Sequence, residues 1–147
     1  MAGKDPLHLV CSHCGSVNRL PGQRLAQQPN CGRCHSALFE GRVAVLDEAS
    51  FAHFVGRNEL PVIVDFWAPW CGPCLQFAPH FAAAAPRLEP GVRLAKLDTE
   101  ANPQTAARFA IRSIPTLIAF QAGRELDRVS GALPPAAFLD WARRLLA

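Results

Sequence analysis

Two cysteines separated by two residues follow directly after an apolar, β-branched run. Residues 62–67 read Val-Ile-Val-Asp-Phe-Trp, and residues 70–74 read Trp-Cys-Gly-Pro-Cys. Where a strand gives way to a helix, this spacing predicts a dithiol that closes into a disulfide and reopens. Cys71 is expected at the start of the helix, where unpaired backbone N–H groups and the positive end of the helix dipole favour the thiolate. Because the thiolate attacks disulfides, the pair predicts redox chemistry.

Four further cysteines form two Cys-x-x-Cys knuckles in the first part of the chain. Cys11 and Cys14 form the first knuckle, Cys31 and Cys34 form the second, and sixteen residues separate the two. This spacing predicts a closed, tetrahedral site for one structural Zn²⁺ ion with four thiolate ligands. A segment of about forty residues buries little core, so a metal is the expected substitute for one. The alternative is two disulfides, or four unconnected cysteines.

The elements that must hold these groups are predicted from hydrophobic periodicity and from capping residues. Asp47 and Ser50 are expected to cap one short helix, and Asn102 is expected to cap another. We expect strands at 43–46, 62–67, 92–97, 116–120 and 124–129, and helices through 51–54, at 71–87, at 103–110 and from 134 onward. This alternation predicts an α/β sheet covered by helices on both faces. A junction at 40–41 divides the chain into a zinc-binding domain, residues 1–41, and a second domain, residues 42–147.

One acidic residue, Asp65, interrupts the apolar strand that leads to the dithiol. A carboxyl group in a buried strand has a raised pKa, because burial disfavours its charged form. We therefore expect Asp65 to lie beneath the dithiol and to accept the proton that Cys74 must lose before it attacks. The alternative is an acid on an edge strand that faces water.

Composition and charge exclude several classes of function. Half of the residues are apolar and 18% are charged, as in a globular protein. The formal net charge of +3 lies entirely in residues 1–46, where four thiolates around one Zn²⁺ would offset most of it. Phe39 is the only aromatic residue among the first 41, so a stacking platform for nucleic acid is not expected. No apolar run is long enough to span a bilayer, and no apolar signal segment precedes Cys11, so we expect a cytoplasmic protein.

Four motifs, taken in order, resemble the thioredoxin family. They are Val-Asp-Phe-Trp-Ala-Pro-Trp-Cys-Gly-Pro-Cys at 64–74, Ala-Lys-Leu-Asp at 95–98, Ile-Arg-Ser-Ile-Pro-Thr at 111–116 and Gly-Ala at 131–132. The resemblance covers residues 42–147 and implies the thioredoxin fold, preceded by a small zinc-ribbon-like domain. With that domain, the whole chain resembles the thioredoxin 2 group, which comprises bacterial cytosolic thioredoxins with an N-terminal four-cysteine zinc domain. Pro69 and Ser113 depart from the commonest family pattern.

The resemblance implies roles for the residues of these motifs. Cys71 would attack the substrate disulfide and Cys74 would resolve the mixed disulfide, while Gly72 and Pro73 would shape the turn between them. Lys96 resembles the family lysine that pairs electrostatically with the buried acid, and its alternative is a solvated strand lysine. Further implied residues are the cis-proline that faces the dithiol, Pro115, and an apolar substrate-docking rim of Trp70, Ile114, Gly131 and Ala132.

The function that follows is a general protein-disulfide reductase, recycled by an NADPH-dependent flavoprotein, thioredoxin reductase. Disulfide-containing proteins would be its substrates, and we expect a monomer. A second hypothesis is a redox-regulated holdase or sensor, in which pairwise oxidation of the knuckles releases zinc. A third, a zinc-ribbon module that binds nucleic acid or a partner protein, is less favoured. The sequence leaves open whether the zinc domain covers the docking rim or packs behind the sheet.

Overall fold

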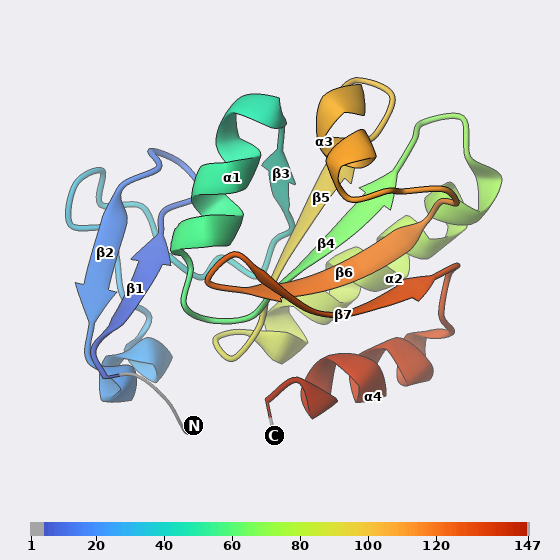
Figure 1. Cartoon of the computed structure of the whole chain (residues 1–147). Helices are drawn as coiled ribbons and strands as arrows, with labels where there is room; N and C mark the ends of the chain where they lie inside the picture. Colours follow the sequence, from blue (N-terminus) through green and yellow to red (C-terminus); the bar gives the residue numbers. More distant parts are fainter. Residues whose placement is uncertain (1–4, 147) are drawn as a thin grey trace.

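The computed structural model describes residues 5–146, which form a small N-terminal part, here called the ribbon (residues 5–41), and a larger part, here called the body (residues 42–146) (Figure 1). The ribbon contains strand β1 (Leu7–Val10), strand β2 (Val17–Leu20) and the 3-10 helix η1 (Gly22–Gln27). β1 and β2 pair antiparallel and form a separate two-stranded sheet. The first cysteine knuckle lies between these two strands, and the second follows η1.

The body is built on one five-stranded sheet in the order β3-β5-β4-β6-β7. The strands are β3 (Ala44–Leu46), β4 (Val62–Trp67), β5 (Arg93–Asp98), β6 (Thr116–Gln121) and β7 (Arg124–Ser130). β3, β5 and β4 run parallel, whereas β6 and β7 join antiparallel. Helices α1 (Glu48–Arg57) and α3 (Pro103–Arg108) cover one face, and α2 (Gly72–Leu88) and α4 (Pro135–Arg144) cover the other (Figure 1). This mixed sheet between two helical layers is the predicted fold class, with most element ends within two residues of those expected.

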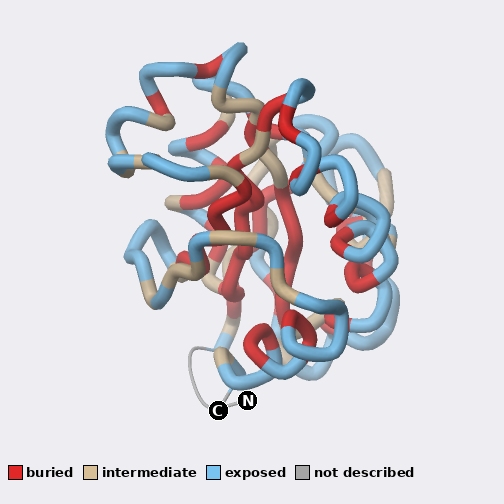
Figure 2. Tube along the Cα trace, turned by 90° about the vertical axis from the view of Figure 1, so that its right-hand side faces the viewer, coloured by how far each residue is buried: buried red, intermediate tan, exposed pale blue. Residues whose placement is uncertain are grey.

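Alternate residues of the central strands build two separate cores, one on each face of the sheet. Ile63 packs with aromatic residues of α2 and α4, such as Phe77 and Phe138. Its neighbours Val62 and Val64 point to the opposite side, toward α1. Figure 2 shows buried residues concentrated in the strands, with exposed residues on the outer turns of the helices. Because both faces are covered, β4 carries apolar residues on both of its sides, interrupted by Asp65.

The N-termini of α1 and α3 stabilise each other. Asp47 and Ser50 cap α1 as predicted, and they do so as a capping box, since each side chain accepts a hydrogen bond from the other residue's backbone N–H. Asn102 occupies the N-cap position of α3, but its side chain does not cap that helix as expected. Its carboxamide oxygen instead accepts from the N–H of Glu48, 2.9 Å away, and the Glu48 carboxylate accepts from Thr105 N–H. The short α3 is thereby tied to α1.

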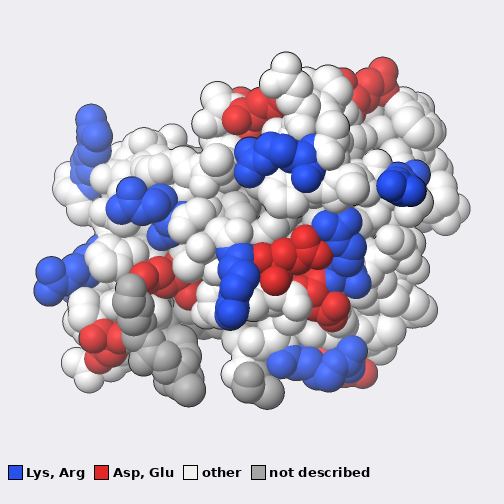
Figure 3. Space-filling model, viewed as in Figure 1, with Lys and Arg blue, Asp and Glu red and all other residues white. Residues whose placement is uncertain are grey.

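Charged groups of both signs are interspersed over the face of the molecule shown in Figure 3. On the described part of this face, no continuous basic patch is seen. Within residues 5–146, no helix is both long and apolar enough to cross a membrane.

The ribbon is hydrogen-bonded to the body along the free edge of β1. The N–H of His8 donates to the Glu59 carboxylate at 2.8 Å, and the N–H of Glu59 donates to His8 C=O at 3.0 Å. The N–H of Val10 donates to the Asn58 side-chain oxygen at 3.0 Å, and Val10 C=O accepts from Arg93 at 2.6 Å. All four outward-facing backbone groups of these two β1 residues are therefore satisfied by the body.

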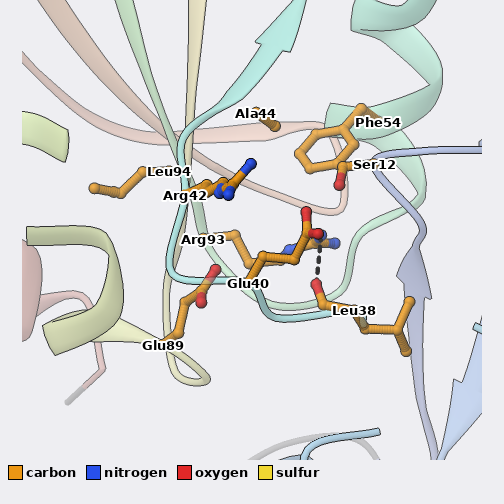
Figure 4. Close-up of a pocket in the computed structure, with 9 residues that line it drawn as sticks. All are labelled: Ser12, Leu38, Glu40, Arg42, Ala44, Phe54, Glu89, Arg93 and Leu94. Atoms are coloured by element: carbon orange, nitrogen blue, oxygen red, sulfur yellow. Dashed lines mark hydrogen bonds between the residues drawn. The ribbon is translucent and has the colours of Figure 1, made fainter. Parts of the chain in front are cut away.

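Arg93, the first residue of β5, is buried between the ribbon and the body and donates hydrogen bonds to the ribbon (Figure 4). Its guanidinium group donates to the carbonyl oxygen of Leu38 in the ribbon, as Figure 4 shows. It also donates to the carbonyl oxygen of Val10 in the ribbon and to the Asn58 side chain in the body. It also lies over the rings of Phe39 and Phe54, at 5.6 and 4.8 Å from their centroids. Arg93 is 4% exposed. A planar group with several fixed donors suits this position, because its acceptors lie in different directions.

The apolar clusters of ribbon and body also interlock. Val10 of β1 belongs to the core beneath α1, whereas Leu60 of the body is buried in the ribbon's own cluster. The contact lies at the start of β5, where Arg93 pairs in register with Val62, the first residue of β4. The dithiol follows the other end of β4, five residue steps or about 17 Å away. The ribbon therefore packs at the end of the sheet remote from the dithiol and leaves the predicted docking rim uncovered (Figure 1).

Candidate functional site

The dithiol lies where β4 gives way to α2. Cys71 and Cys74 are joined by a disulfide with a Cα–Cα distance of 5.2 Å, and both are at least 95% buried. Cys71 is the N-cap residue of α2, and its sulfur accepts a hydrogen bond from the N–H of Cys74 at 3.2 Å. Gly72 and Pro73 are the exposed first residues of the helix. When the disulfide opens, this N–H and the helix dipole stabilise a thiolate on Cys71.

Asp65 lies on β4, the strand that leads into the dithiol loop, and is 3% exposed. One of its carboxylate oxygens, Oδ1, has no hydrogen-bond partner within the described part of the chain. Burial raises the pKa of Asp65 to about 7, against the opposing effect of the Lys96 charge. Lys96 pairs in register with Asp65 on β5, and its ammonium group lies 5.2 Å from the Trp67 ring centroid. A carboxyl group with a pKa near neutrality can exchange protons at physiological pH.

A rim of backbone and apolar groups surrounds Cys71. The sulfur of Cys71 lies 3.7 Å from the carbonyl oxygen of Ile114, and the Ile114–Pro115 peptide bond is cis. The N–H of Gly131 donates to Pro115 C=O at 2.7 Å, which places the end of β7 beside this loop. The structure thus brings together the predicted rim residues from three separate segments: Trp70, Ile114, Gly131 and Ala132. Trp70 is 69% exposed.

The four remaining cysteines meet in the ribbon. Their sulfur atoms all lie within 4.8 Å of one another. The sulfurs of Cys11 and Cys34 are 3.6 Å apart, as are those of Cys14 and Cys31. A tetrahedral site with metal–sulfur distances of about 2.3 Å has sulfur–sulfur edges of about 3.8 Å. The donor set and its spacing therefore fit a zinc ion.

Backbone and side-chain N–H groups orient the sulfurs. The N–H groups of His13 and Arg33 donate to the sulfurs of Cys11 and Cys31, each at 3.4 Å. Asn18 donates to Cys31 at 3.5 Å and accepts from Gly32 N–H at 2.8 Å. Hydrogen bonds, the largest from the Cys34 backbone, lower the pKa of Cys31 to about 5. Such partners around the ligands hold a metal site in shape.

Three polar residues that hold the ribbon in place were not identified from the sequence: Asn18, Asn58 and Arg93. Asn18 donates to the sulfur of Cys31, whereas Asn58 and Arg93 bond to the backbone of the ribbon. Arg93 carried a usable signal, because it interrupts an apolar strand just as Asp65 does. Asn58 is fully buried, but its sequence position after a helix is equally typical of a solvated loop. Asn18 lies in a strand with no local pattern that marks it as a partner of sulfur.

Comparisons with known proteins cover both parts of the chain. A family model described as Thioredoxin matches residues 42–144. The chain belongs to the thioredoxin family. A second family model, described as Thioredoxin 2, N-terminal, a zinc ribbon, matches residues 10–36. The thioredoxin resemblance seen in the sequence is therefore confirmed for the body and for the ribbon.

Several named thioredoxins are similar to this chain. Thioredoxin C-3 of Corynebacterium nephridii is 47% identical over 133 residues, which cover 90% of this chain and 91% of that protein. The thioredoxin of Synechocystis is 49% identical over 89 residues, and that of Porphyra purpurea is 48% identical over 92 residues. These two matches cover 60% and 63% of this chain and 83% and 86% of the two relatives. The body has the thioredoxin fold, and the chain is a thiol-disulfide oxidoreductase with protein-disulfide reductase activity.

Proposed function

We propose that this thioredoxin is a general protein-disulfide reductase that works through the Cys71–Cys74 dithiol and is recycled by an NADPH-dependent thioredoxin reductase. The observation that supports this most directly is the position of Cys71. It caps α2, its sulfur accepts the Cys74 N–H, and it borders an open rim. An uncovered rim suits many protein substrates, since it imposes few steric limits on them.

Reduction would proceed in two displacement steps. The Cys71 thiolate attacks one sulfur of the substrate disulfide, which forms a mixed disulfide and releases the other substrate sulfur as a thiolate that takes up a proton. The Cys74 thiolate then attacks the Cys71 sulfur, which closes the Cys71–Cys74 disulfide and releases the second substrate thiolate. Overall, two electrons and two protons pass from the dithiol to the substrate, and the reductase later restores them.

The remaining roles follow from the surroundings of the dithiol. Asp65 takes the proton from Cys74 before the second step, and Lys96 tunes the acidity of Asp65. The Ile114 carbonyl next to Pro115 pairs with the extended substrate backbone, which favours substrates of many sequences. Trp70, Gly131 and Ala132 supply the flanking surface.

The ribbon would hold one structural zinc ion through its four cysteines. Four sulfur ligands leave no open coordination position, so the metal would supply folding energy and no bond-breaking chemistry. We propose that residues 1–41 form this zinc-binding domain and residues 42–147 the catalytic one. The protein would act in the cytoplasm, because the reductant for its disulfide is available there. It would act as a monomer.

Substitution of the two active-site cysteines tests the proposal. With NADPH and a thioredoxin reductase, we expect the wild-type chain to reduce protein disulfides and Cys71→Ser to lose all such activity. Cys74→Ser should form a mixed disulfide with the substrate and stall there, because no resolving thiol remains. Mass spectrometry of the trapped complex provides the second measurement. Undiminished reduction by Cys71→Ser would contradict the proposed roles.

A second candidate function, a redox-controlled zinc switch, is favoured by one observation. Sulfurs from different knuckles lie 3.6 Å apart, and Cys14 is exposed. Oxidation could therefore join cysteines between knuckles as well as within one, and either disulfide would release zinc. Zinc release upon mild peroxide treatment, with a gain in suppression of aggregation, would support this function. Retention of zinc under peroxide would argue against it.

A further inference from the structure

One large apolar side chain beside the dithiol has no role so far. In the described part of the chain, the exposed large apolar residues are Val45, Trp70, Leu75 and Leu146. Two of the four, Trp70 and Leu75, lie within four residues of Cys71 on either side. Leu75 is 52% exposed although it directly follows the buried Cys74. Isolated exposed leucines are ordinary, but the pairing of these two around one sulfur requires an explanation.

Helix geometry directs Leu75 toward the reactive sulfur. Leu75 is one turn beyond Cys71 on α2, and its N–H donates to the Cys71 carbonyl at 3.1 Å. Residues four apart share a face of a helix, and helical side chains lean toward the N-terminus. Leu75 therefore covers the surface over the turn that contains Cys71. Trp70, which is exposed, directly precedes Cys71 in the chain, and Ile114 packs against the two cysteines from the loop before β6.

The part of α2 between Gly72 and Pro86 carries no acidic residue, lysine or arginine, and the first such residue, Arg87, lies in the last turn of the helix. Ala78 and Ala82, which are exposed and share the helix face of Leu75, extend the apolar character of the surface away from the dithiol. A partner that docks against Leu75 thus meets no carboxylate, lysine or arginine on the neighbouring turns of α2 that it would have to desolvate.

We propose that Leu75 is a specificity-determining residue that selects disulfide partners with an apolar residue next to the reactive cysteine. The proposal rests on the reductase function proposed above. A partner segment that reaches Cys71 must pass between Leu75, Trp70 and Ile114. An apolar neighbour of the partner cysteine buries surface against Leu75 and gains binding energy, whereas a charged neighbour is desolvated without a counter-charge.

A second copy of this chain is a poor occupant of the same surface. In a symmetric dimer the same patch of both copies is buried. Because Leu75 adjoins Cys71, such a dimer would cover the dithiol of both subunits and prevent access of substrates. The occupant is therefore a disulfide partner in transient contact, of the small interface size that is usual for redox encounters.

The test compares two peptides, each closed by one disulfide, that differ only in the residue beside the reactive cysteine: valine in one and aspartate in the other. We expect Leu75→Gln, which introduces no charge near the thiol, to raise KM for the valine peptide about five- to tenfold. Its kcat, and the KM of the aspartate peptide, should remain within about twofold of wild type. Leu75→Met should restore KM, because it restores apolar area.

Leu146→Gln is the matched control. Its exposed fraction of 49% is similar to the 52% of Leu75, but Leu146 lies beside Gly91, at the end of the sheet remote from the dithiol. This variant should leave the KM of both peptides unchanged. Equal KM for the valine peptide in wild type and Leu75→Gln, or an equal rise for both peptides, would overturn the proposal. So would a wild-type dimer that Leu75→Gln converts to a monomer, as measured by sedimentation. Failure of the reductase function itself would differ, because wild type would then reduce neither peptide.

Discussion

The buried carboxyl group of Asp65 connects the chemistry of the dithiol with the stability of the fold. Its charged form is disfavoured by burial, which raises the pKa to about 7 from an ordinary value near 3.8. Between about pH 4 and pH 7 the folded chain therefore binds more protons at this site than the unfolded chain. Stability must fall as the pH rises through this range and level off above it.

Replacement of Asp65 by Asn should remove the free-energy cost of burying a charged carboxylate at this position. At pH 8 we expect Asp65→Asn to raise the free energy of unfolding by on the order of 3 kcal/mol, because a neutral side chain replaces a buried charge. At pH 4 the gain should vanish. The variant should also resolve mixed disulfides more slowly. Urea unfolding at both pH values, with Asp140→Asn on the exposed face of α4 as control, measures the effect. A gain that is the same at both pH values would contradict the assigned pKa.

Residue types and spacing were sufficient to predict both sulfur sites and the unusual acid. Cys71, the zinc-type knuckles and Asp65 each stand out because a reactive or charged residue occurs where the local pattern has no structural need for it. Arg93 shows the same contrast but depends on acceptors 83 and 55 residues away, Val10 and Leu38. A sequence pattern indicates that such a residue is unusual, but it does not identify the partners of that residue. The partners of Arg93 are known only once the packing of the ribbon against the body is known.

At the scale of elements, the ribbon strand β1 is hydrogen-bonded along both of its edges, as a strand inside a sheet is. Its free edge bonds to the loop after α1, and Arg93 donates to it from the start of β5. The sequence predicted strands and helices of the body from periodicity, but the placement of β1 required contacts between distant segments. Asn102 is a similar case, because its side chain serves α1, the neighbouring helix, instead of its own.

Arg93→Lys should weaken this contact while keeping the charge. Two guanidinium nitrogens of Arg93 reach the carbonyls of Val10 and Leu38 separately. A lysine side chain is shorter and carries all its N–H donors on one nitrogen, so it cannot reach both carbonyls together. We expect the free energy of unfolding to fall by about 2 kcal/mol, since a buried carbonyl is left without a donor. Urea unfolding of Arg93→Lys beside Arg57→Lys, an exposed arginine of α1, measures the difference. Equal stability of the two variants would show that the contact contributes little.

At the scale of the whole molecule, ribbon and body share parts of their cores yet place their sulfur sites at opposite ends of the sheet. Val10 is buried in the body cluster and Leu60 in the ribbon cluster, so neither part keeps its core intact if the two separate. The dithiol, by contrast, has its contacts in the first turn of α2 and in the loop before β6, to which the residue after β7 is hydrogen-bonded. Stability should therefore be shared between the parts, whereas catalysis should remain local to the body.

Removal of the metal tests this division. The three tryptophans, Trp67, Trp70 and Trp141, all lie in the body, so their fluorescence reports on the body alone. If the parts unfold together, a chelator that strips zinc from the ribbon should lower the tryptophan-detected midpoint by about 10 °C or more. Reductase activity at 25 °C should persist, because the Cys71 rim does not touch the ribbon. Zinc release followed by a dye should coincide with the fluorescence transition in the untreated protein. The same chelator already saturated with zinc is the control; a midpoint unmoved by chelation would mean that the body folds independently of the ribbon.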